Sequence, residues 1–175
     1  EILLARGTYE LPAVTLGIEA GYISGQDRTK SDEITAFVTP YSFSPFAMIG
    51  QLAINGMDVL GNNSTAGSTS DFDSNMTYGK LFVQGSPMPK LDAYLAIGYA
   101  SAAQDRIDTT LQKRDQLGTE IDLSLTYGIT PNLSYNFTGG VLFTGDWYKN
   151  PAAGSFGTNE KENAVLAVHS ITVNF

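Results

Sequence analysis

The chain of 175 residues contains no cysteine, one histidine and one tryptophan. Without cysteine it has no disulfide, no thiolate zinc site and no cysteine nucleophile, and a single histidine excludes a multi-histidine metal site. Basic residues are also scarce, with 10 Lys and Arg against 18 Asp and Glu, and the net charge of −8 argues against a nucleic-acid binder, which needs a basic surface. No run of 18 or more apolar residues is present, so no transmembrane helix is predicted. The sequence predicts no cofactor and no metal site.

Glycine and aromatic residues are abundant, with 18 Gly, nine Phe and nine Tyr. The mean hydropathy of −0.07 is that of a soluble protein. A transmembrane β-barrel has a similar average, because each of its strands alternates apolar lipid-facing residues with polar inward residues. The length suits a single domain, which we predict to cover residues 1–175.

Period-2 alternation of apolar and polar residues is the main pattern, and helical spacing is poor throughout. In the segment 119–130, TEIDLSLTYGIT, Ile121 and Leu123 share one face while Glu120 and Asp122 share the other. The alternation predicts nine strands: Leu3–Leu11, Ala13–Tyr22, Ile34–Tyr41, Ala47–Asn55, Met76–Gly85, Leu91–Ser101, Thr119–Thr130, Asn132–Trp147 and Ala164–Phe175. Their lengths match the roughly 9–11 residues of a membrane-spanning strand better than the roughly 5–6 of a globular one. A transmembrane barrel is therefore favoured over a soluble β-sandwich.

The predicted connections alternate between short and long. The short ones all contain proline, near Pro12, Pro40–Pro45, Pro87–Lys90 and Pro131, and the long, polar ones cover 24–33, 56–74, 102–117 and 149–163. Short turns on one side and long loops on the other are the plan of an outer-membrane barrel. The predicted fold is an all-β, antiparallel, up-and-down transmembrane β-barrel.

Nine strands do not make a complete single-chain bacterial barrel, which has an even number of strands. In one solution the chain is the C-terminal portion of a larger barrel, and the missing strands or a homo-oligomer supply the rest. In the other, Glu1–Pro12 lies outside the membrane and the chain from Ala13 onward forms a complete eight-stranded barrel. The alternation within Glu1–Pro12 favours the first solution.

The chain ends in Phe175, with Val173 and Ile171 at the preceding alternate positions. This ending resembles the C-terminal signature of bacterial outer-membrane β-barrel proteins, which implies recognition by the barrel-assembly machinery. Three further segments resemble the last half of large porin-like barrels of Gram-negative bacteria, including alginate-export-type proteins: Glu19–Asp27, Leu117–Tyr127 and Thr144–Lys149. The resemblance implies an integral location in the outer membrane, in contact with lipid and lipopolysaccharide. It also implies a basic channel for a polyanion, whereas the inward faces here are mostly acidic, which argues against alginate.

The inward faces of the strands supply the candidate channel lining: Arg6, Glu10, Glu19, Lys80, Asp92, Glu120, Asp122 and Asp146. Because acidic rings in a pore favour cations, the sequence predicts a channel for passive diffusion of ions or small hydrophilic solutes with a preference for cations. In a narrow barrel the same charged groups would instead pair with one another and fill the interior.

Aromatic residues near the predicted strand ends are typical of the girdles at membrane interfaces: Tyr22, Tyr99, Tyr127, Tyr135, Trp147 and Tyr148. Carbohydrate stacking on Trp147 and Tyr148 is an alternative role. Acidic residues in the predicted loops are candidates for calcium binding or, more simply, a solvated surface: Asp27, Asp32, Glu33, Asp58, Asp71, Asp73, Asp105 and Asp108.

His169 is the candidate for catalysis, as the base of a lipid-modifying barrel enzyme. Such an enzyme needs a serine nucleophile within reach, and the adjacent Ser170 points to the opposite face of a strand. The chain is therefore predicted not to be an enzyme. A small structural or anchoring eight-stranded barrel is the remaining alternative.

Overall fold

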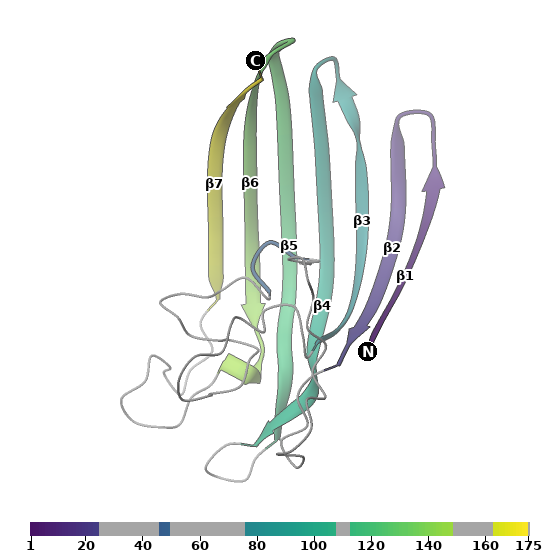
Figure 1. The fold of residues 1–175 in the computed structure, drawn as a ribbon, viewed down its shortest axis with the longest axis vertical. Helices are drawn as coiled ribbons and strands as arrows, with labels where there is room; N and C mark the ends of the chain where they lie inside the picture. Colours follow the sequence, from purple (N-terminus) through teal and green to yellow (C-terminus); the bar gives the residue numbers. More distant parts are fainter. Residues whose placement is uncertain (25–45, 50–75, 108–112, 149–162, 175) are drawn as a thin grey trace.

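The computed structural model describes residues 1–24, 46–49, 76–107, 113–148 and 163–174. Within them, seven antiparallel strands form one sheet in sequence order (Figure 1). The strands are β1 (Ile2–Glu10), β2 (Val14–Ile23), β3 (Met76–Met88), β4 (Leu91–Ile107), β5 (Lys113–Thr130), β6 (Leu133–Thr144) and β7 (Ala164–Val173), and the short 3-10 helix η2 (Asp146–Tyr148) follows β6. The predicted all-β, up-and-down architecture is confirmed. The sheet is open, and β1 and β7 are its two edges.

The first strand belongs to the sheet. β1 pairs with β2 over its whole length, from Ile2 opposite Ile23 to Glu10 opposite Thr15. The alternative in which the first twelve residues stand apart from an eight-stranded barrel is therefore wrong.

Two of the nine predicted strands have no counterpart in the described sheet. β2 pairs directly with β3, so no strand lies between them. The predicted strand Ile34–Tyr41 lies outside the described residues. Of the predicted strand Ala47–Asn55, only residues 47–49 are described, and they form bends and a turn instead of a strand. The prediction is wrong there because this part of the chain lies against the sheet instead of joining it.

Other strand ends also differ from the prediction. The strand predicted for Asn132–Trp147 ends at Thr144, and η2 begins two residues later. β4 and β5 run beyond the predicted ends at Ser101 and Thr119, so most of the long connection predicted for 102–117 is strand. A bulge interrupts the pairing of these two strands at Leu117, and Gly118 beside it has a φ of 128°, a conformation that favours glycine.

Three of the short, proline-containing turns are confirmed, and they lie at one end of the sheet (Figure 1). They connect β1 to β2, β3 to β4 and β5 to β6. The Asn174 amide at the end of β7 donates to the Asn132 carbonyl over 3.0 Å, which places the end of β7 beside the third turn. The fourth predicted short turn, Pro40–Pro45, lies outside the described residues.

The strand register keeps the two alternating sets of side chains on opposite faces across all seven strands. Ile121, for example, is opposite Ile97 and Val141, so apolar residues face the same way on three neighbouring strands. We call the resulting surface the apolar face and the opposite one the polar face. The apolar face consists of Leu3, Ala5, Gly7, Tyr9, Val14, Leu16, Ile18, Ala20, Tyr22, Thr77, Gly79, Leu81, Val83, Gly85, Leu91, Ala93, Leu95, Ile97, Tyr99, Thr119, Ile121, Leu123, Leu125, Tyr127, Leu133, Tyr135, Phe137, Gly139, Val141, Phe143, Val165, Ala167, His169, Ile171 and Val173.

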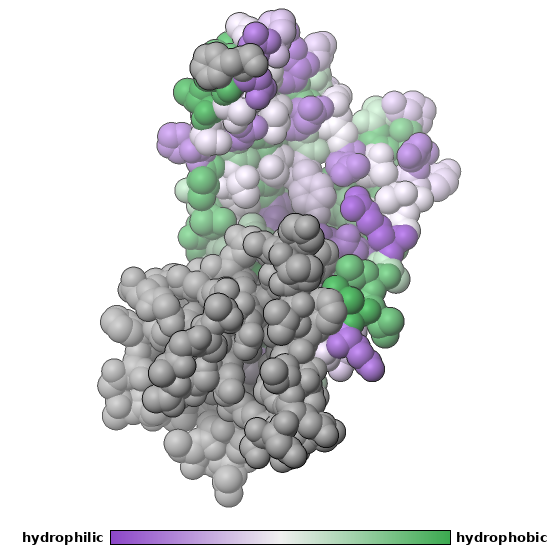
Figure 2. Space-filling model, viewed as in Figure 1, coloured by the Kyte–Doolittle hydropathy of each residue, from purple (hydrophilic) through white to green (hydrophobic). Residues whose placement is uncertain are grey.

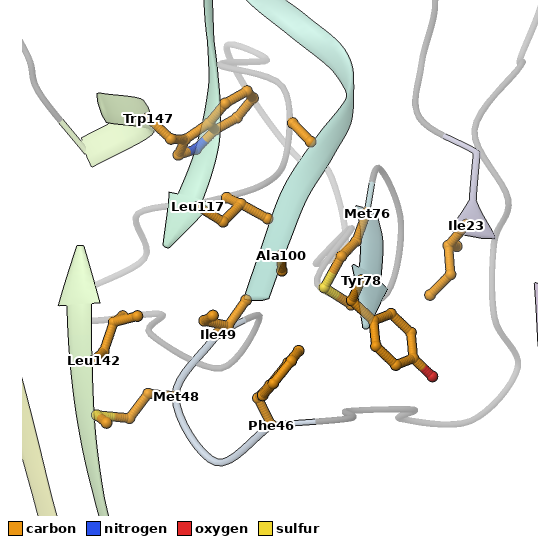
Figure 3. Packing of buried hydrophobic residues seen from close by; sticks show 11 residues of the cluster. Ile23, Phe46, Met48, Ile49, Met76, Tyr78, Ala100, Leu117, Leu142 and Trp147 are labelled. Carbon is orange, nitrogen blue, oxygen red and sulfur yellow. The ribbon is translucent and has the colours of Figure 1, made fainter. Parts of the chain in front are cut away.

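The buried hydrophobic cluster lies on the polar side of the sheet, toward the end opposite the short turns. It combines strand residues such as Met76, Ala100 and Leu142 with Phe46, Met48 and other neighbours from outside the strands (Figure 3). The large side chains of the apolar face remain exposed among the described residues; Leu81, for example, is 56% exposed. None of the helical segments in the described ranges has the length and apolar character of a membrane-spanning helix.

Candidate functional site

Charge is confined to the polar face in the regular part of the sheet, between the short turns and the bulge beside Gly118. The charged residues of this part are Arg6, Glu10, Glu19, Lys80, Asp92, Glu120 and Asp122, and the register places every one of them on the polar face. These are seven of the eight residues predicted to line a channel. The eighth, Asp146, lies in η2 after the end of β6, where its Oδ1 accepts a hydrogen bond from the Gln116 amide.

Three of these charges form a cluster across β1, β2 and β3. Lys80 Nζ lies 3.2 Å from Glu19 Oε1, and Arg6 Nη1 lies 3.8 Å from Glu19 Oε2. The Tyr78 hydroxyl also donates to Glu19 Oε1, over 3.0 Å. The Arg6 guanidinium carbon lies 4.6 Å from the centre of the Phe82 ring, within cation–π range. The charges of the polar face therefore pair with one another across these three strands.

Glu120 and Asp122 bind a segment from outside the strands, Phe46–Ile49, which we call the docked segment. The Met48 and Ile49 amides donate to the two carboxylate oxygens of Glu120, each over 2.6 Å. The Ala47 amide donates to Asp122 Oδ2 over 3.3 Å. The Glu120 side chain is fully buried and Asp122 is only 7% exposed, so these two acids hold backbone and do not line open space.

Two glycines beside these acids make room for the docked segment. Gly98 is opposite Glu120 in the register, and a Cβ atom on Gly98 would lie 2.5 Å from Phe46 Cε1. Gly140 is opposite Asp122, and a Cβ atom there would lie 2.8 Å from Asp122 Oδ1. Any larger residue would push against the segment or against the carboxylate that binds it. The glycines therefore form the floor of the docking site.

Apolar packing completes the docking site (Figure 3). The side chains of Met48 and Leu142 belong to the same buried cluster, and the Phe46 ring meets the Tyr78 ring edge-on at 5.8 Å. The sequence contains a pattern that could indicate burial of this segment. Residues 46–49 are apolar without interruption and do not alternate as a half-buried strand does. Their partners could not be found from this pattern, because Glu120 is 71 residues away from Ile49.

The half of the polar face nearer the short turns is polar, and its charged residues are the two acids Glu10 and Asp92. Asp92 accepts a hydrogen bond from the Ser86 hydroxyl over 2.5 Å. The Thr126 hydroxyl donates to Asn136 Oδ1 over 3.1 Å, and Asn136 Nδ2 donates to the Thr172 hydroxyl over 3.0 Å. Figure 2 shows this half as mostly pale and purple residues, in the upper part of the view.

The predicted girdle residues Tyr22, Tyr99, Tyr127 and Tyr135 lie on the apolar face. Tyr127 is opposite Tyr135 near the short turns, whereas Tyr22 and Tyr99 lie toward the other end. Trp147 does not match its predicted interfacial place, because it is only 4% exposed and packs in the buried cluster. The Tyr148 side chain lies outside the described part.

His169 lies on the apolar face, with its ring centre 6.2 Å from that of Tyr135. Ser170 faces the polar side, opposite Asn136, so the two residues are separated by the sheet. Ile171 and Val173 of the C-terminal signature share the apolar face with His169, and Phe175 is outside the described range.

The described residues contain no group of three or more His, Cys, Asp or Glu side chains that could hold a metal ion. The acids considered for calcium binding lie outside the described side chains, and Asp105 is in β4 instead of a loop. No protein-family model matches the sequence, and no curated protein matches it.

Proposed function

We propose that the chain forms part of a porin-like β-barrel in the bacterial outer membrane, through which ions or small hydrophilic solutes diffuse passively. The observation that carries the proposal is the separation of the two faces. In the regular part of the sheet, between the short turns and the bulge beside Gly118, the apolar face has no Asp, Glu, Lys or Arg, and its large residues are exposed: Ile18 is 58%, Leu81 56% and Val165 76% exposed. Soluble monomers rarely expose contiguous apolar patches larger than a few hundred Å². Contact with lipid would remove the free-energy cost of exposing these apolar side chains to water.

The dimensions of the apolar face fit a bilayer. On β5 the apolar face runs from Thr119 to Tyr127, and the exposed Ile129 continues the same alternation. The distance from Thr119 to Ile129 is about 34 Å along the strand and about 25 Å along the membrane normal at a tilt near 40°. The outward apolar band of outer-membrane barrels has a height of about 25 Å. In the proposed orientation Tyr22 and Tyr99 mark one interface and Tyr127 and Tyr135 the other.

Closure of the barrel requires strands beyond the seven described. β1 and β7 run in the same direction, because an odd number of alternating strands separates the edges. A second copy with the same membrane orientation would place its β1 parallel to β7, so copies of these seven strands alone do not give an all-antiparallel barrel. We infer that an odd number of further strands joins the two edges and gives the even total typical of bacterial barrels.

The charges left accessible set the proposed selectivity. Glu120 and Asp122 are buried under the docked segment, and Glu19 is paired with Lys80. The charged side chains that remain exposed on the polar face are Glu10, Asp92 and Arg6. Two acids against one base predict a weak preference for cations in the part of the lumen formed by these strands.

The edge strand β7 carries the proposed assembly signal. Ile171 and Val173 lie on its apolar face, and no further strand pairs with its outer edge among the described residues. An unpaired strand edge of this kind offers backbone groups to the barrel-assembly machinery and, afterwards, to a neighbouring strand.

Single-channel recording in planar bilayers tests the proposal. The full-length protein, including the further strands that close the barrel, is refolded in detergent and reconstituted in lipid, and a stable, ohmic conductance with weak cation preference in a salt gradient is expected. Glu10→Gln together with Asp92→Asn removes the two exposed acids, and the cation preference should fall or reverse because Arg6 remains. Absence of any conductance from a preparation shown by circular dichroism to be folded would contradict the channel.

A further inference from the structure

We propose that the polar face contains a binding subsite for a neutral polyhydroxylated solute, a sugar or polyol, near the short turns. The proposal rests on the proposed channel function for the access of the solute. A hollow in this region has the β1–β2 turn at its rim, and its polar lining comes from Thr15, Gln84, Asp92, Tyr94, Ser124 and Thr126.

The lining residues form two neighbouring rows of the register. Thr15 is opposite Gln84, Gln84 is opposite Tyr94, and Tyr94 is opposite Ser124, so one row crosses four strands. Neighbouring strands are about 4.8 Å apart, so hydrogen-bonding groups repeat at that spacing along the row. In the next row Asp92 is opposite Thr126. A flat solute with hydroxyl groups on several sides can contact both rows at once.

The groups of the first row are available to a ligand. Within the described part of the chain, the side chains of Thr15, Gln84, Tyr94 and Ser124 form no hydrogen bond with the protein. The Tyr94 ring is nevertheless held in place, because it stacks on Phe82 with ring centres 5.7 Å apart. Its hydroxyl is thus presented in a fixed direction, which lowers the entropy lost on binding.

The chemistry of the lining selects a neutral ligand with both donors and acceptors. Hydroxyl and amide groups provide both kinds of hydrogen bond. The one carboxylate of the hollow, Asp92, already accepts a hydrogen bond from Ser86. No Lys or Arg is among the described residues that line the hollow, so no base is placed there to bind an anion. Arg6 is held instead beside Glu19 and over the Phe82 ring. Glu10 ends the first row on the edge strand β1, where it is exposed to solvent.

Saturation-transfer NMR on the full chain in lipid nanodiscs tests the subsite without requiring conductance. D-glucose and myo-inositol should show saturable transfer, whereas tetraethylene glycol, which has ether acceptors and few donors, should not. Tyr94→Phe and Gln84→Met should each weaken binding about 3- to 10-fold, the range for one lost neutral hydrogen bond. Tyr127→Phe makes the same chemical change on the apolar face and should leave binding unchanged.

The outcomes separate the subsite from the channel. Equal transfer to glucose and to the polyether, or unchanged binding in Tyr94→Phe and Gln84→Met, overturns the subsite even if the protein conducts. Specific binding of glucose by a protein that shows no conductance supports the subsite and contradicts the channel. Conductance without saturable transfer supports the channel and contradicts the subsite.

Discussion

The two faces of the sheet come from the same seven strands but are organised by different rules. On the apolar face, one property repeats at every position: the side chain carries no charge and is mostly apolar. On the polar face, the composition changes along the strands. The half with the docked segment contains Arg6, Glu19, Lys80, Glu120 and Asp122, each with a specific partner. The half near the short turns contains mainly hydroxyl and amide groups, with the two acids Glu10 and Asp92.

This difference separates a general requirement from a specific one. A surface that contacts lipid needs only apolar side chains of suitable size, so one apolar residue can replace another at small cost. A surface that binds backbone amides through buried carboxylates needs particular atoms at particular places, because a buried polar group without a partner costs about 1–3 kcal/mol. On the apolar face, the stability effect of a substitution should therefore depend on whether the new side chain is apolar or charged. On the polar face, it should depend on whether the new side chain keeps the particular hydrogen-bonding atoms.

The largest effect is expected from a charge on the apolar face. Leu123→Arg, at the middle of β5, should destabilise the folded protein in lipid vesicles by about 2–4 kcal/mol, because the guanidinium would lie near the bilayer midplane. Unfolding in guanidinium chloride measures the change. Ser124→Arg places the same side chain one residue later on the polar face and should cost less than about 1 kcal/mol, in keeping with its aqueous surroundings. Similar losses for the two variants would remove the distinction between the faces.

Glu120→Gln should release the docked segment with little effect on the sheet. The amide nitrogen of glutamine cannot accept a hydrogen bond, so either the Met48 or the Ile49 amide loses its acceptor. Hydrogen exchange at these two amides should accelerate about 10- to 100-fold, from the cost of one buried unpaired donor. Glu10→Gln, on the edge strand, is the matched control and should leave the exchange rates of both amides unchanged. Unaltered exchange in Glu120→Gln would show that the carboxylate does not hold the segment.

Gly98→Ala should weaken docking by steric contact without changing any charge. Its Cβ atom would lie 2.5 Å from Phe46 Cε1 and 2.6 Å from Lys80 Cβ. Relief of this overlap should cost about 1–3 kcal/mol of folding stability, measured as a lower midpoint in thermal unfolding. Gly79→Ala is the control, since nothing lies within 4 Å of a Cβ atom there. If both substitutions shifted the midpoint equally, close packing over Gly98 would be refuted.

The smallest difference in stability loss is expected between two substitutions within the charged cluster of Arg6, Glu19 and Lys80. Lys80→Met removes a side chain that is 9% exposed and leaves Glu19, which is 13% exposed, without its nearest cation. Arg6→Met removes a side chain that is 53% exposed and 3.8 Å from the same carboxylate. Urea unfolding should give a larger loss for Lys80→Met than for Arg6→Met, whose contribution should stay below about 1 kcal/mol because solvent screens it. The reverse order would contradict the described pairing.

Much of the sheet could be predicted from alternation alone. A one-residue slip would move every side chain of a strand to the other face, so residues such as Ile121 and Glu120 fix both the face and the register. The prolines at 12, 87, 89 and 131 marked the three turns that the structure describes. The ends of β4 and β5 were missed because the bulge beside Gly118 breaks the alternation that defines a strand in the sequence.

The docked segment could not be predicted because its stability comes from contacts distant in sequence. Residues 47–49 were assigned to a strand on their apolar character, yet their amides bind Glu120 and Asp122 instead of a neighbouring strand. The same two acids were expected to line water. Trp147 was placed at an interface for its amphipathic ring, whereas burial against Leu117 and its neighbours determines its place. A tertiary contact in each case overrides the local pattern.

A nitroxide scan of β5 tests the separation of the two faces most directly. The chain has no cysteine, so single cysteines at each position from Ile121 to Thr126 can be labelled without removing any native residue. In lipid vesicles, collision rates with oxygen should peak at Ile121, Leu123 and Leu125, and those with a water-soluble nickel chelate should peak at Ser124 and Thr126. Equal access of the nickel chelate to both sets would contradict the assignment of the apolar face to lipid.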